Sequence, residues 1–269
     1  MDICVIGAGY VGLVTSACLA YLGNHVTAVE ANPERLGSLK SGLVPFFEPG
    51  LQDFVKETSE SGFLNFSDNL EEAVKRAQII FIAVGTPSLP NGEPDLSQVM
   101  VVARSIGSAL DAKHRRIIVN KSTVPVGSGN WVEMLVSQGV QNAQPVPARA
   151  ARPESPSFVV VSNPEFLREG SAIADSFYPD RIVVGSTDEQ AVAVMKSLYK
   201  PIVEQSFDVP TFAPRPKEFS SVPFVVTDLA SAELIKYSAN AFLAMKISFA
   251  NEIAGLCEKV GADVSQVTQ

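Results

Sequence analysis

Cysteine is scarce in this 269-residue chain, and its three copies have no recognisable spacing. Cys4, Cys18 and Cys257 form an odd set without a Cys-x-x-Cys pair, and each lies in an apolar or helical stretch. Such a set is typical of reduced core residues in a cytosolic protein rather than of a disulfide framework or a metal site. We therefore expect a cytoplasmic protein without a metal centre.

Positive charge is also in short supply. Lys and Arg total 21 against 29 Asp and Glu, which gives a formal net charge of -8 and a pI near 4.9. A chain with this balance has no global positive field to attract polyphosphate, which argues against nucleic-acid and anionic-membrane partners. A phosphate-bearing ligand would have to be bound by local devices.

The only long uncharged run, residues 3–22, does not have the form of a membrane helix or a signal peptide. Asp2 is the only charged residue before it, so the basic segment of a signal peptide is missing. Gly7, Gly9 and Gly12 fall where a spanning helix would have to stay continuous. A buried strand that passes through a glycine turn into a buried helix explains the run better, and we expect no membrane association.

Apolar, β-branched runs alternate with helical segments along the chain, which predicts βαβ units. The runs are 3–6, 25–30, 63–66, 78–84, 116–120, 158–161 and 181–185. Asn32-Pro33 predicts the start of a helix that Gly42 ends, and Asp68 is the predicted N-cap of another. The expected fold class is α/β, a Rossmann-type doubly wound parallel sheet covered by helices on both faces.

The last part of the chain predicts one long helix, from Thr227 or Asp228 to Val260, with Gly261 as its stop. At 1.5 Å per residue it would be roughly 50 Å long, so we expect it to connect domains. The expected division is a dinucleotide-binding domain over 1–226 and, over 227–269, this helix with the start of a further domain. Two Pro-rich stretches, 141–157 and 213–223, are expected to be exposed loops.

A Gly-x-Gly-x-x-Gly motif follows the first predicted strand. It reads Gly7-Ala8-Gly9-Tyr10-Val11-Gly12 and opens an apolar helix, which is the context that gives the motif meaning. The first glycine permits a tight turn, the second lets backbone amides approach a pyrophosphate, and the third lets helix pack on strand. A ligand-free glycine turn is the weaker interpretation.

Glu30 ends the second predicted strand, where a carboxylate accepts hydrogen bonds from the adenosine ribose and repels a 2′-phosphate. NAD is therefore the predicted cofactor, in preference to NADP. Arg35 on the following helix would either reach the adenosine end or remain a solvated surface charge.

Three further sets of polar residues have both functional and structural interpretations. Thr86 and Thr123 follow the fourth and fifth strands, at the ligand-binding edge, or they are loop-capping hydroxyls. Glu165 and Glu169 are predicted to share one face of a short helix beginning near Pro164, where the helix dipole alone would explain them. Lys236 and Asn240 lie one turn apart on the long helix, and Lys236 is either used there or snorkels to solvent.

Seven motifs in order along the chain are similar to those of the UDP-glucose/GDP-mannose dehydrogenase family. They are Gly7-Ala-Gly-Tyr-Val-Gly-Leu13, Phe47-Glu-Pro-Gly-Leu51, Val84-Gly-Thr-Pro87, Ser122-Thr-Val-Pro-Val126, Asn163-Pro-Glu-Phe-Leu-Arg-Glu-Gly170, Pro179-Asp-Arg181 and Ala232-Glu-Leu-Ile-Lys-Tyr-Ser-Ala-Asn-Ala-Phe-Leu243. Arg168-Glu169-Gly170 and Tyr178-Pro-Asp-Arg181 resemble most closely the members that act on UDP-glucose.

The resemblance implies a role for each candidate residue. Glu165 would be the general acid/base, Thr123 would lie near a catalytic water, and Lys236 and Asn240 would bind the sugar and stabilise charge on its C6 oxygen. The implied cofactor contacts are Gly7, Gly9, Tyr10, Val11, Gly12, Glu30, Arg35, Thr86, Thr123 and Glu169, and the implied substrate contacts are Glu165, Phe166, Leu167, Arg168, Glu169, Lys236 and Asn240. UDP-glucose would be the substrate, oxidised twice to UDP-glucuronate, and the long helix would support a homodimer or a higher oligomer.

The family's catalytic cysteine lies in a glycine-rich loop after the long helix, and no segment of the 269 residues matches that loop. We therefore expect this chain to be inactive alone. Three hypotheses stay open: part of a UDP-glucose dehydrogenase, another nucleotide-sugar or β-hydroxyacid dehydrogenase, and a non-enzymatic NAD-binding module.

Overall fold

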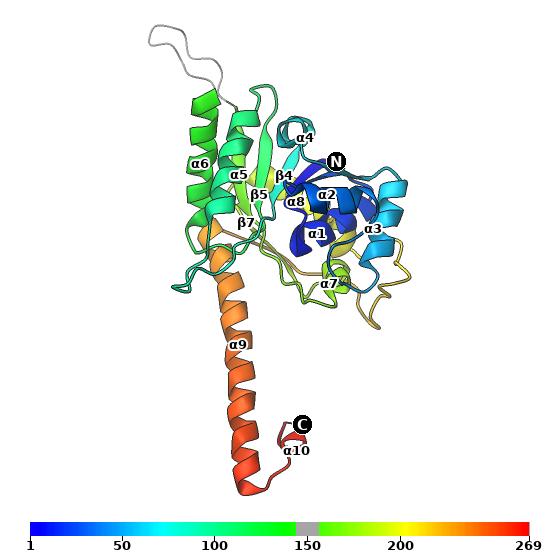
Figure 1. Cartoon of the computed structure of the whole chain (residues 1–269), viewed down its shortest axis with the longest axis vertical. Coiled ribbons are helices and arrows are strands. Elements are labelled where there is room, and N and C mark those ends of the chain that lie inside the picture. The colour runs from blue at the N-terminus through cyan, green and yellow to red at the C-terminus, as the bar shows by residue number, and fades with distance from the viewer. Residues whose placement is uncertain (144–155, 269) are drawn as a thin grey trace.

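An eight-stranded sheet forms the centre of the computed structural model, which describes residues 1–143 and 156–268 (Figure 1). The strands are β1 (Asp2–Ile6), β2 (His25–Val29), β3 (Leu64–Ser67), β4 (Ile79–Ile82), β5 (Arg116–Asn120), β6 (Phe158–Ser162), β7 (Ile182–Gly185) and β8 (Phe224–Thr227). The helices are α1 (Tyr10–Tyr21), α2 (Pro33–Lys40), α3 (Leu51–Glu60), α4 (Leu70–Arg76), α5 (Ser97–Ala109), α6 (Ser128–Ala143), α7 (Ala172–Phe177), α8 (Glu189–Val203), α9 (Leu229–Val260) and α10 (Val264–Val267).

The strand order is β3-β2-β1-β4-β5-β6-β7-β8, and β1 to β6 are all parallel. This order, which reverses direction at β1, confirms the predicted doubly wound α/β fold. The prediction of a wholly parallel sheet is wrong at one edge, because β7 is antiparallel to β6. β8, parallel to β7, was not predicted, although Phe224-Val225-Val226 is a short apolar run; Val225 and Val226 are exposed in the structure.

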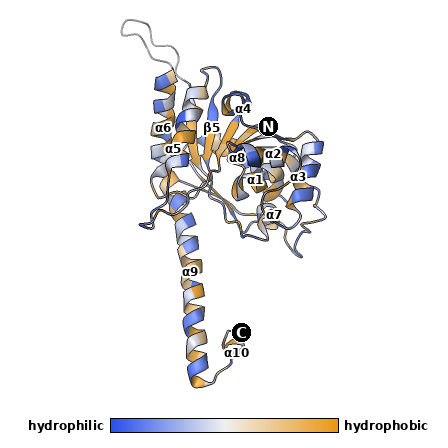
Figure 2. Cartoon of the chain, viewed as in Figure 1, coloured by the Kyte–Doolittle hydropathy of each residue, from blue (hydrophilic) through white to orange (hydrophobic). Residues whose placement is uncertain are grey.

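Alternate residues of each central strand face two separate cores. In β1, Ile3 and Val5 pack on one face while Cys4 and Ile6 pack on the other, as the two-residue period of a strand requires. Helices α1, α3, α7 and α8 cover the first face, and α4, α5 and α6 cover the second. Figure 2 shows the resulting hydrophobic interior at the strands. A sheet covered on both faces accounts for the continuous apolar strand sequences.

The predicted helix start agrees with the structure at α2 and differs by one residue at α4. Asn32 caps α2 by accepting a hydrogen bond from the Arg35 amide at 2.9 Å, as predicted. The N-cap of α4 is Asn69 and not Asp68, because the Asn69 side chain accepts from the Glu72 amide at 3.1 Å. Asp68 lies one residue too early to reach that amide.

The two Pro-rich stretches have different outcomes. Most of 141–157 lies outside the described residues. The 213–223 stretch is irregular, as expected, but it is not simply exposed: Ala213 and Val222 are buried. Tyr178 donates a hydrogen bond to the Ala213 carbonyl at 2.8 Å, and Phe219 lies edge-on to the Tyr178 ring. This segment closes one end of the first core.

Helix α9 has 32 residues, is capped by Asp228 and ends at left-handed Gly261, as predicted. Its first turns pack on β7, where a Cβ on Gly185 would lie only 2.6 Å from the Cβ of Ala232. Beyond them the helix projects away from the sheet (Figure 1). The exposed apolar residues on this part are Phe242, Leu243, Met245, Ile247, Phe249, Leu256 and Val260.

The reversal of β7 determines where α9 begins. β6 and β7 pair only through Ser162 and Gly185, the last residue of each strand, and Gly185 is in register with Thr227 at the end of β8. The carboxyl ends of these three strands therefore meet. Because α9 follows β8 directly, its first turns lie at the carboxyl edge of the sheet, where doubly wound folds bind ligands.

Candidate cofactor and substrate site

The glycine-rich turn between β1 and α1 has the geometry that its sequence predicted. Gly7 has a φ of +98°, and a Cβ there would lie 2.7 Å from the Ala83 carbonyl oxygen. A Cβ on Gly12 would lie 1.8 Å from the Gly7 carbonyl oxygen, so helix and turn touch. Gly9 faces open space instead, and the first α1 hydrogen bond runs from the Leu13 amide to the Gly9 carbonyl. The preceding amides, including those of Tyr10 and Val11, stay available to an anion.

Glu30 lies beside this turn, since the Gly7 amide donates to the Val29 carbonyl at 2.9 Å. The Glu30 carboxylate is buried and accepts from the Asn32 amide at 2.8 Å and from the Arg35 guanidinium at 3.2 Å. Arg35 is thus neither free in solvent nor independent of Glu30; the two form one ion pair. Each carboxylate oxygen keeps a further lone pair for ribose hydroxyls.

Thr86 and Thr123 are brought together at the carboxyl ends of β4 and β5. The Thr86 hydroxyl donates to the Thr123 carbonyl at 2.9 Å. Ser122 adds a second link between the two segments, donating to the Val84 carbonyl at 2.8 Å. The Thr86 hydroxyl therefore has the loop-bonding role considered above, and its oxygen can still accept a hydrogen bond.

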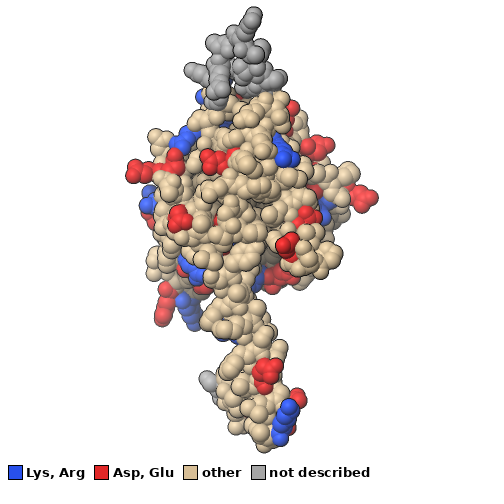
Figure 3. Space-filling view, turned by 90° about the vertical axis from the view of Figure 1, so that its left-hand side faces the viewer, with Lys and Arg blue, Asp and Glu red and all other residues tan. Residues whose placement is uncertain are grey.

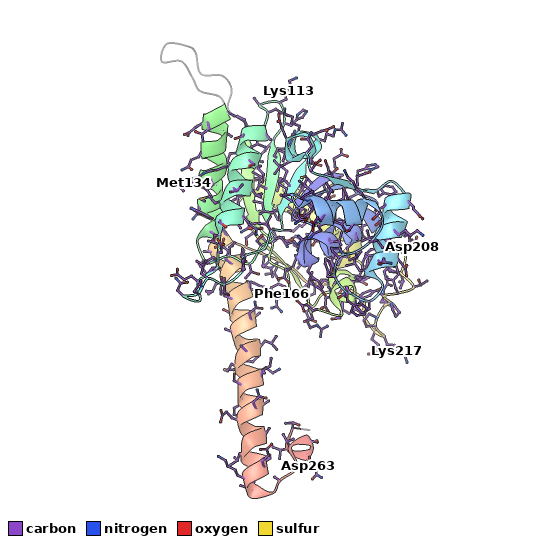
Figure 4. The ribbon with its side chains drawn as sticks, viewed as in Figure 1. Lys113, Met134, Phe166, Asp208, Lys217 and Asp263 are labelled. Carbon is purple, nitrogen blue, oxygen red and sulfur yellow. The ribbon has the colours of Figure 1, made fainter. Side chains whose placement is uncertain are left out.

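A cavity of about 400 Å³ lies between the loop that follows β6 and the first turns of α9. Six of the residues predicted to contact substrate line it: Glu165, Phe166, Leu167, Arg168, Lys236 and Asn240. In the described part of the chain, the lining does not include Glu169, Thr86 or Thr123. In Figure 4, Phe166 lies beside the upper part of α9, below the sheet.

A buried ion pair connects the loop to the helix inside this cavity. The Lys236 ammonium lies 2.9 Å from a Glu165 carboxylate oxygen, and their side chains are only 9% and 11% exposed. The other carboxylate oxygen accepts from the Leu167 amide at 2.8 Å. Lys236 therefore does not snorkel to solvent. Its Nζ also lies 5.4 Å from the centre of the Phe166 ring, which the Arg181 guanidinium approaches at 4.7 Å.

Lys121, which sequence reasoning missed, is a second ammonium in the cavity lining. Its Nζ donates to the Asn163 side-chain oxygen at 3.3 Å, and that oxygen also accepts from the Tyr199 hydroxyl at 2.6 Å. Burial lowers the pKa of Lys121 to about 8, although the nearby Glu165 carboxylate opposes the shift. Its position directly after an apolar strand, two residues before Thr123, was the available signal.

The loop 163–171, between β6 and α7, corrects one prediction. No helix begins near Pro164, and Glu165 and Glu169 do not share a helical face. The amides that such a helix would need are bonded elsewhere: Arg168 donates to Asp175 and Gly170 donates to Glu48, both at 2.8 Å. Arg168 also pairs with Asp175 through its guanidinium, and Glu169 is exposed.

Glu48, a member of a quoted motif but not of the predicted site, holds this loop. One carboxylate oxygen accepts from the Tyr10 hydroxyl and the Gly170 amide, and the other accepts from the Ala172 amide at 2.8 Å. Glu233 has a similar function at the start of α6, accepting from the amides of Gly127 at 2.6 Å and Gly129 at 2.7 Å. Neither role is visible from sequence, because the bonded amides are more than 100 residues away and Tyr10 is 38 residues from Glu48.

None of the three cysteines is placed as an exposed nucleophile, since all three are free and buried. Cys18 lines the cavity, but burial raises the pKa of its thiol to about 12. Within residues 1–143 and 156–268, no group of three or more His, Cys, Asp or Glu is placed to hold a metal ion. No helix in the same ranges is long and apolar enough to span a membrane. The face drawn in Figure 3 shows acidic and basic side chains interspersed rather than one extended basic patch.

The doubly wound sheet, the glycine turn and the carboxylate after β2 define a dinucleotide-binding domain. The chain belongs to the UDP-glucose/GDP-mannose dehydrogenase family: the family's NAD-binding domain matches residues 1–203, and its central domain matches residues 230–269. This confirms the resemblance seen in the motifs and identifies NAD as the cofactor of the matched domain.

Relatives and solved structures agree with this assignment. The chain is 44% identical over 265 residues to UDP-glucose 6-dehydrogenase TuaD of Bacillus subtilis, with 98% of the chain and 50% of the relative covered. It is 43% identical over 267 residues to the UDP-glucose 6-dehydrogenase of Pseudomonas aeruginosa, covering 99% of the chain and 53% of the relative. The chain thus spans about half the length of the curated relatives it matches.

Two solved structures are similar across almost the whole chain. A ternary complex of GDP-mannose dehydrogenase from Pseudomonas aeruginosa has a TM-score of 0.83 and 32% identity, covering 100% of this chain and 56% of that one. A UDP-glucose dehydrogenase from Pyrobaculum islandicum has a TM-score of 0.83 and 39% identity, covering 98% of this chain and 55% of that one. The fold and the family are therefore shown by independent comparisons.

Proposed function

We propose that this chain supplies the NAD site and part of the sugar site of an enzyme that oxidises UDP-glucose to UDP-glucuronate, reducing two NAD in the process. The buried Glu165–Lys236 pair carries the proposal, because a base and a cation share one cavity at the carboxyl edge of the sheet. Relatives at 43–44% identity that are named UDP-glucose 6-dehydrogenases support the choice of sugar nucleotide.

The residues around the glycine turn fit NAD. Gly9 leaves room for a pyrophosphate, and the amides of Tyr10 and Val11 can bond it. Glu30 would accept hydrogen bonds from the adenosine ribose and repel a 2′-phosphate, with Arg35 holding its carboxylate in place. Thr86 and Thr123 would contact the other half of the dinucleotide.

When bound, NAD accepts a hydride from C6 of the sugar. In our proposal Glu165 takes the proton of the C6 hydroxyl, for which its carboxylate is already oriented by the Leu167 amide. Lys236 has three donors and can bond both Glu165 and a C6 oxygen, stabilising negative charge there as an oxyanion site does. Asn240 lies one turn further along the same face and would hold a sugar hydroxyl.

The remaining predicted contacts divide into two groups. Phe166 and Leu167 line the cavity and would pack against the substrate. Arg168 also lines the cavity, but it is largely exposed and its guanidinium is bonded to Asp175. Glu169 is exposed and outside the lining, so its contacts would need a bound ligand at the outer side of the loop. Thr123 would position the water for the second oxidation, for which the resemblance implies a cysteine nucleophile as well.

We propose two domains, an NAD-binding domain over 1–226 and a second unit that starts with α9 over 227–269. The projecting apolar part of α9 suits an interface with a second copy, so we propose a homodimer or higher oligomer.

Calorimetric titration of the chain with NAD and with NADP tests the cofactor assignment. We expect clear binding of NAD and much weaker binding of NADP, and Glu30→Ala should narrow the difference. Glu34→Ala, in the first turn of α2 and exposed, is the matched control and should leave the preference intact. Equal affinity of the unmodified chain for the two dinucleotides would refute the proposed role of Glu30.

A further inference from the structure

Glu48 connects the start of α1, where the dinucleotide is proposed to bind, with the 163–171 loop, which carries the proposed base Glu165. Its carboxylate is buried and accepts from Tyr10, the first residue of α1, from the amide of Gly170 near the end of the 163–171 loop, and from the amide of Ala172, the first residue of α7. Glu48 itself lies in neither part, but in the irregular segment before α3. It takes no part in the chemistry proposed above.

Tyr10 faces the proposed dinucleotide and the loop at the same time. Its backbone amide is one of those left free at the start of α1, whereas its hydroxyl donates to Glu48 and accepts from the Gly170 amide at 3.1 Å. Its ring lies 5.3 Å from that of Phe46, which limits the orientations of the phenol. An anion bonded to the Tyr10 amide would therefore restrict the same residue whose hydroxyl holds the loop.

We infer that Tyr10 and Glu48 are positioning residues through which a bound dinucleotide orders the loop that carries Glu165. This inference rests on the proposed binding of NAD at the glycine turn. A dinucleotide that favours one position of Tyr10 favours the arrangement in which Glu48 accepts from Gly170 and Ala172. By reciprocity, a loop held in this arrangement strengthens dinucleotide binding by the same factor.

The other bonds of the loop make the link specific. The Arg168 amide donates to Asp175 and the Leu167 amide donates to Glu165, so neither depends directly on Tyr10 or Glu48. Ordering through Tyr10 and Glu48 should therefore be strongest at the amides of Gly170 and Ala172. Leu167 serves as an internal reference within the same loop, because the Tyr10 hydroxyl also lies 3.4 Å from the Arg168 carbonyl oxygen.

Residue-resolved hydrogen exchange with and without saturating NAD tests this inference. In the unmodified chain we expect NAD to slow exchange at Gly170 and Ala172 more than at Leu167. In Tyr10→Phe, which keeps the ring contact with Phe46, the NAD-dependent slowing should fall by about fivefold, the factor that one ordinary hydrogen bond contributes to an equilibrium. Glu48→Gln should give the same loss, because one amide side chain cannot accept from all three donors.

Tyr21→Phe is the matched control. Tyr21 also lies on α1, and its hydroxyl donates to the Asp208 carbonyl at 3.1 Å, away from the loop. This variant should retain the full NAD response. Equal NAD-dependent slowing at Gly170 and Ala172 in Tyr10→Phe and in the unmodified chain would overturn the inference. So would a Tyr10→Phe variant in which exchange at these amides is faster by the same factor with and without NAD. Failure of the unmodified chain to bind NAD would overturn the proposed function, and this inference with it.

Discussion

Replacing Lys236 by Met should destabilise the fold, because it leaves the Glu165 carboxylate buried without its cation. The substitution keeps the length and apolar stem of the side chain, so it removes little besides the ammonium. The two side chains are 9% and 11% exposed and their charged atoms are 2.9 Å apart, so each charge is largely withdrawn from bulk water and interacts directly with the other. The perturbation thus reports on the pair rather than on packing.

The expected cost follows from what Glu165 retains. Removing one partner of a buried pair typically costs 3–5 kcal/mol, because the remaining charge is uncompensated. Here the carboxylate keeps the Leu167 amide as a donor and the nearby Lys121 ammonium as a second cation, which places the expected loss at the lower end, about 3 kcal/mol. Against a total stability of about 5–15 kcal/mol, such a loss is easily measured.

Urea unfolding of four proteins completes the assay: the unmodified chain, Lys236→Met, Glu165→Gln and the double variant. Each single variant leaves one buried charge, whereas the double variant leaves none, so its cost should be smaller than the sum of the two single costs by about 2 kcal/mol. Additive costs below about 0.5 kcal/mol each would show that the pair is solvated, and would refute our account of the cavity.

Three further predictions follow from Lys121, α9 and the cysteines. Burial lowers the pKa of Lys121 from 10.5 to about 8, so between these pH values the unfolded chain binds more protons than the folded one. The free energy of unfolding should therefore rise with pH in this window, by up to about 3 kcal/mol. Urea unfolding at stepped pH should show this rise, and Lys121→Met should abolish it. The exposed apolar residues of α9 should make the chain self-associate, which a monodisperse monomer in sedimentation at tens of micromolar would contradict. Because all three cysteines are buried, the chain alone should form NADH from UDP-glucose only at background level. Formation of two NADH per UDP-glucose would contradict this prediction, and Cys257 would then be the first candidate nucleophile to mutate.

The sequence was most informative where local chemistry determines the backbone. Gly7 and Gly12 occupy positions that admit no side chain, and Asn32, Asp228 and Gly261 mark helix ends through their own bonding or backbone conformation. Such signals involve residues a few positions apart, so they can be read from the chain alone. The alternation of apolar strands and helices identified the fold for the same reason.

Several of the errors involve partners that are distant in sequence, whereas the N-cap of α4, misplaced by one residue, is a local one. A helix at Pro164 was reasonable locally, but Asp175 and Glu48 bind the amides that it would have used. β8 was missed although Phe224-Val225-Val226 is an apolar run, because the strand has only four residues and lies between a Pro-rich stretch and the start of the long helix. Lys121 was overlooked because its burial is decided by neighbours such as Asn163, which only the fold brings near.

The first turns of α9 act as a common anchor for two loops that the sheet supports separately. Glu233 fixes the amides at the start of α6, just after the segment that carries Thr123, and one turn later Lys236 fixes Glu165. The distance between the Thr123 hydroxyl and the Glu165 carboxylate is thus set by Glu233 and Lys236, which lie three positions apart on one helix. A substitution of Glu233 would accordingly resemble an active-site mutation in its kinetics, although in our proposal the carboxylate contacts neither cofactor nor sugar.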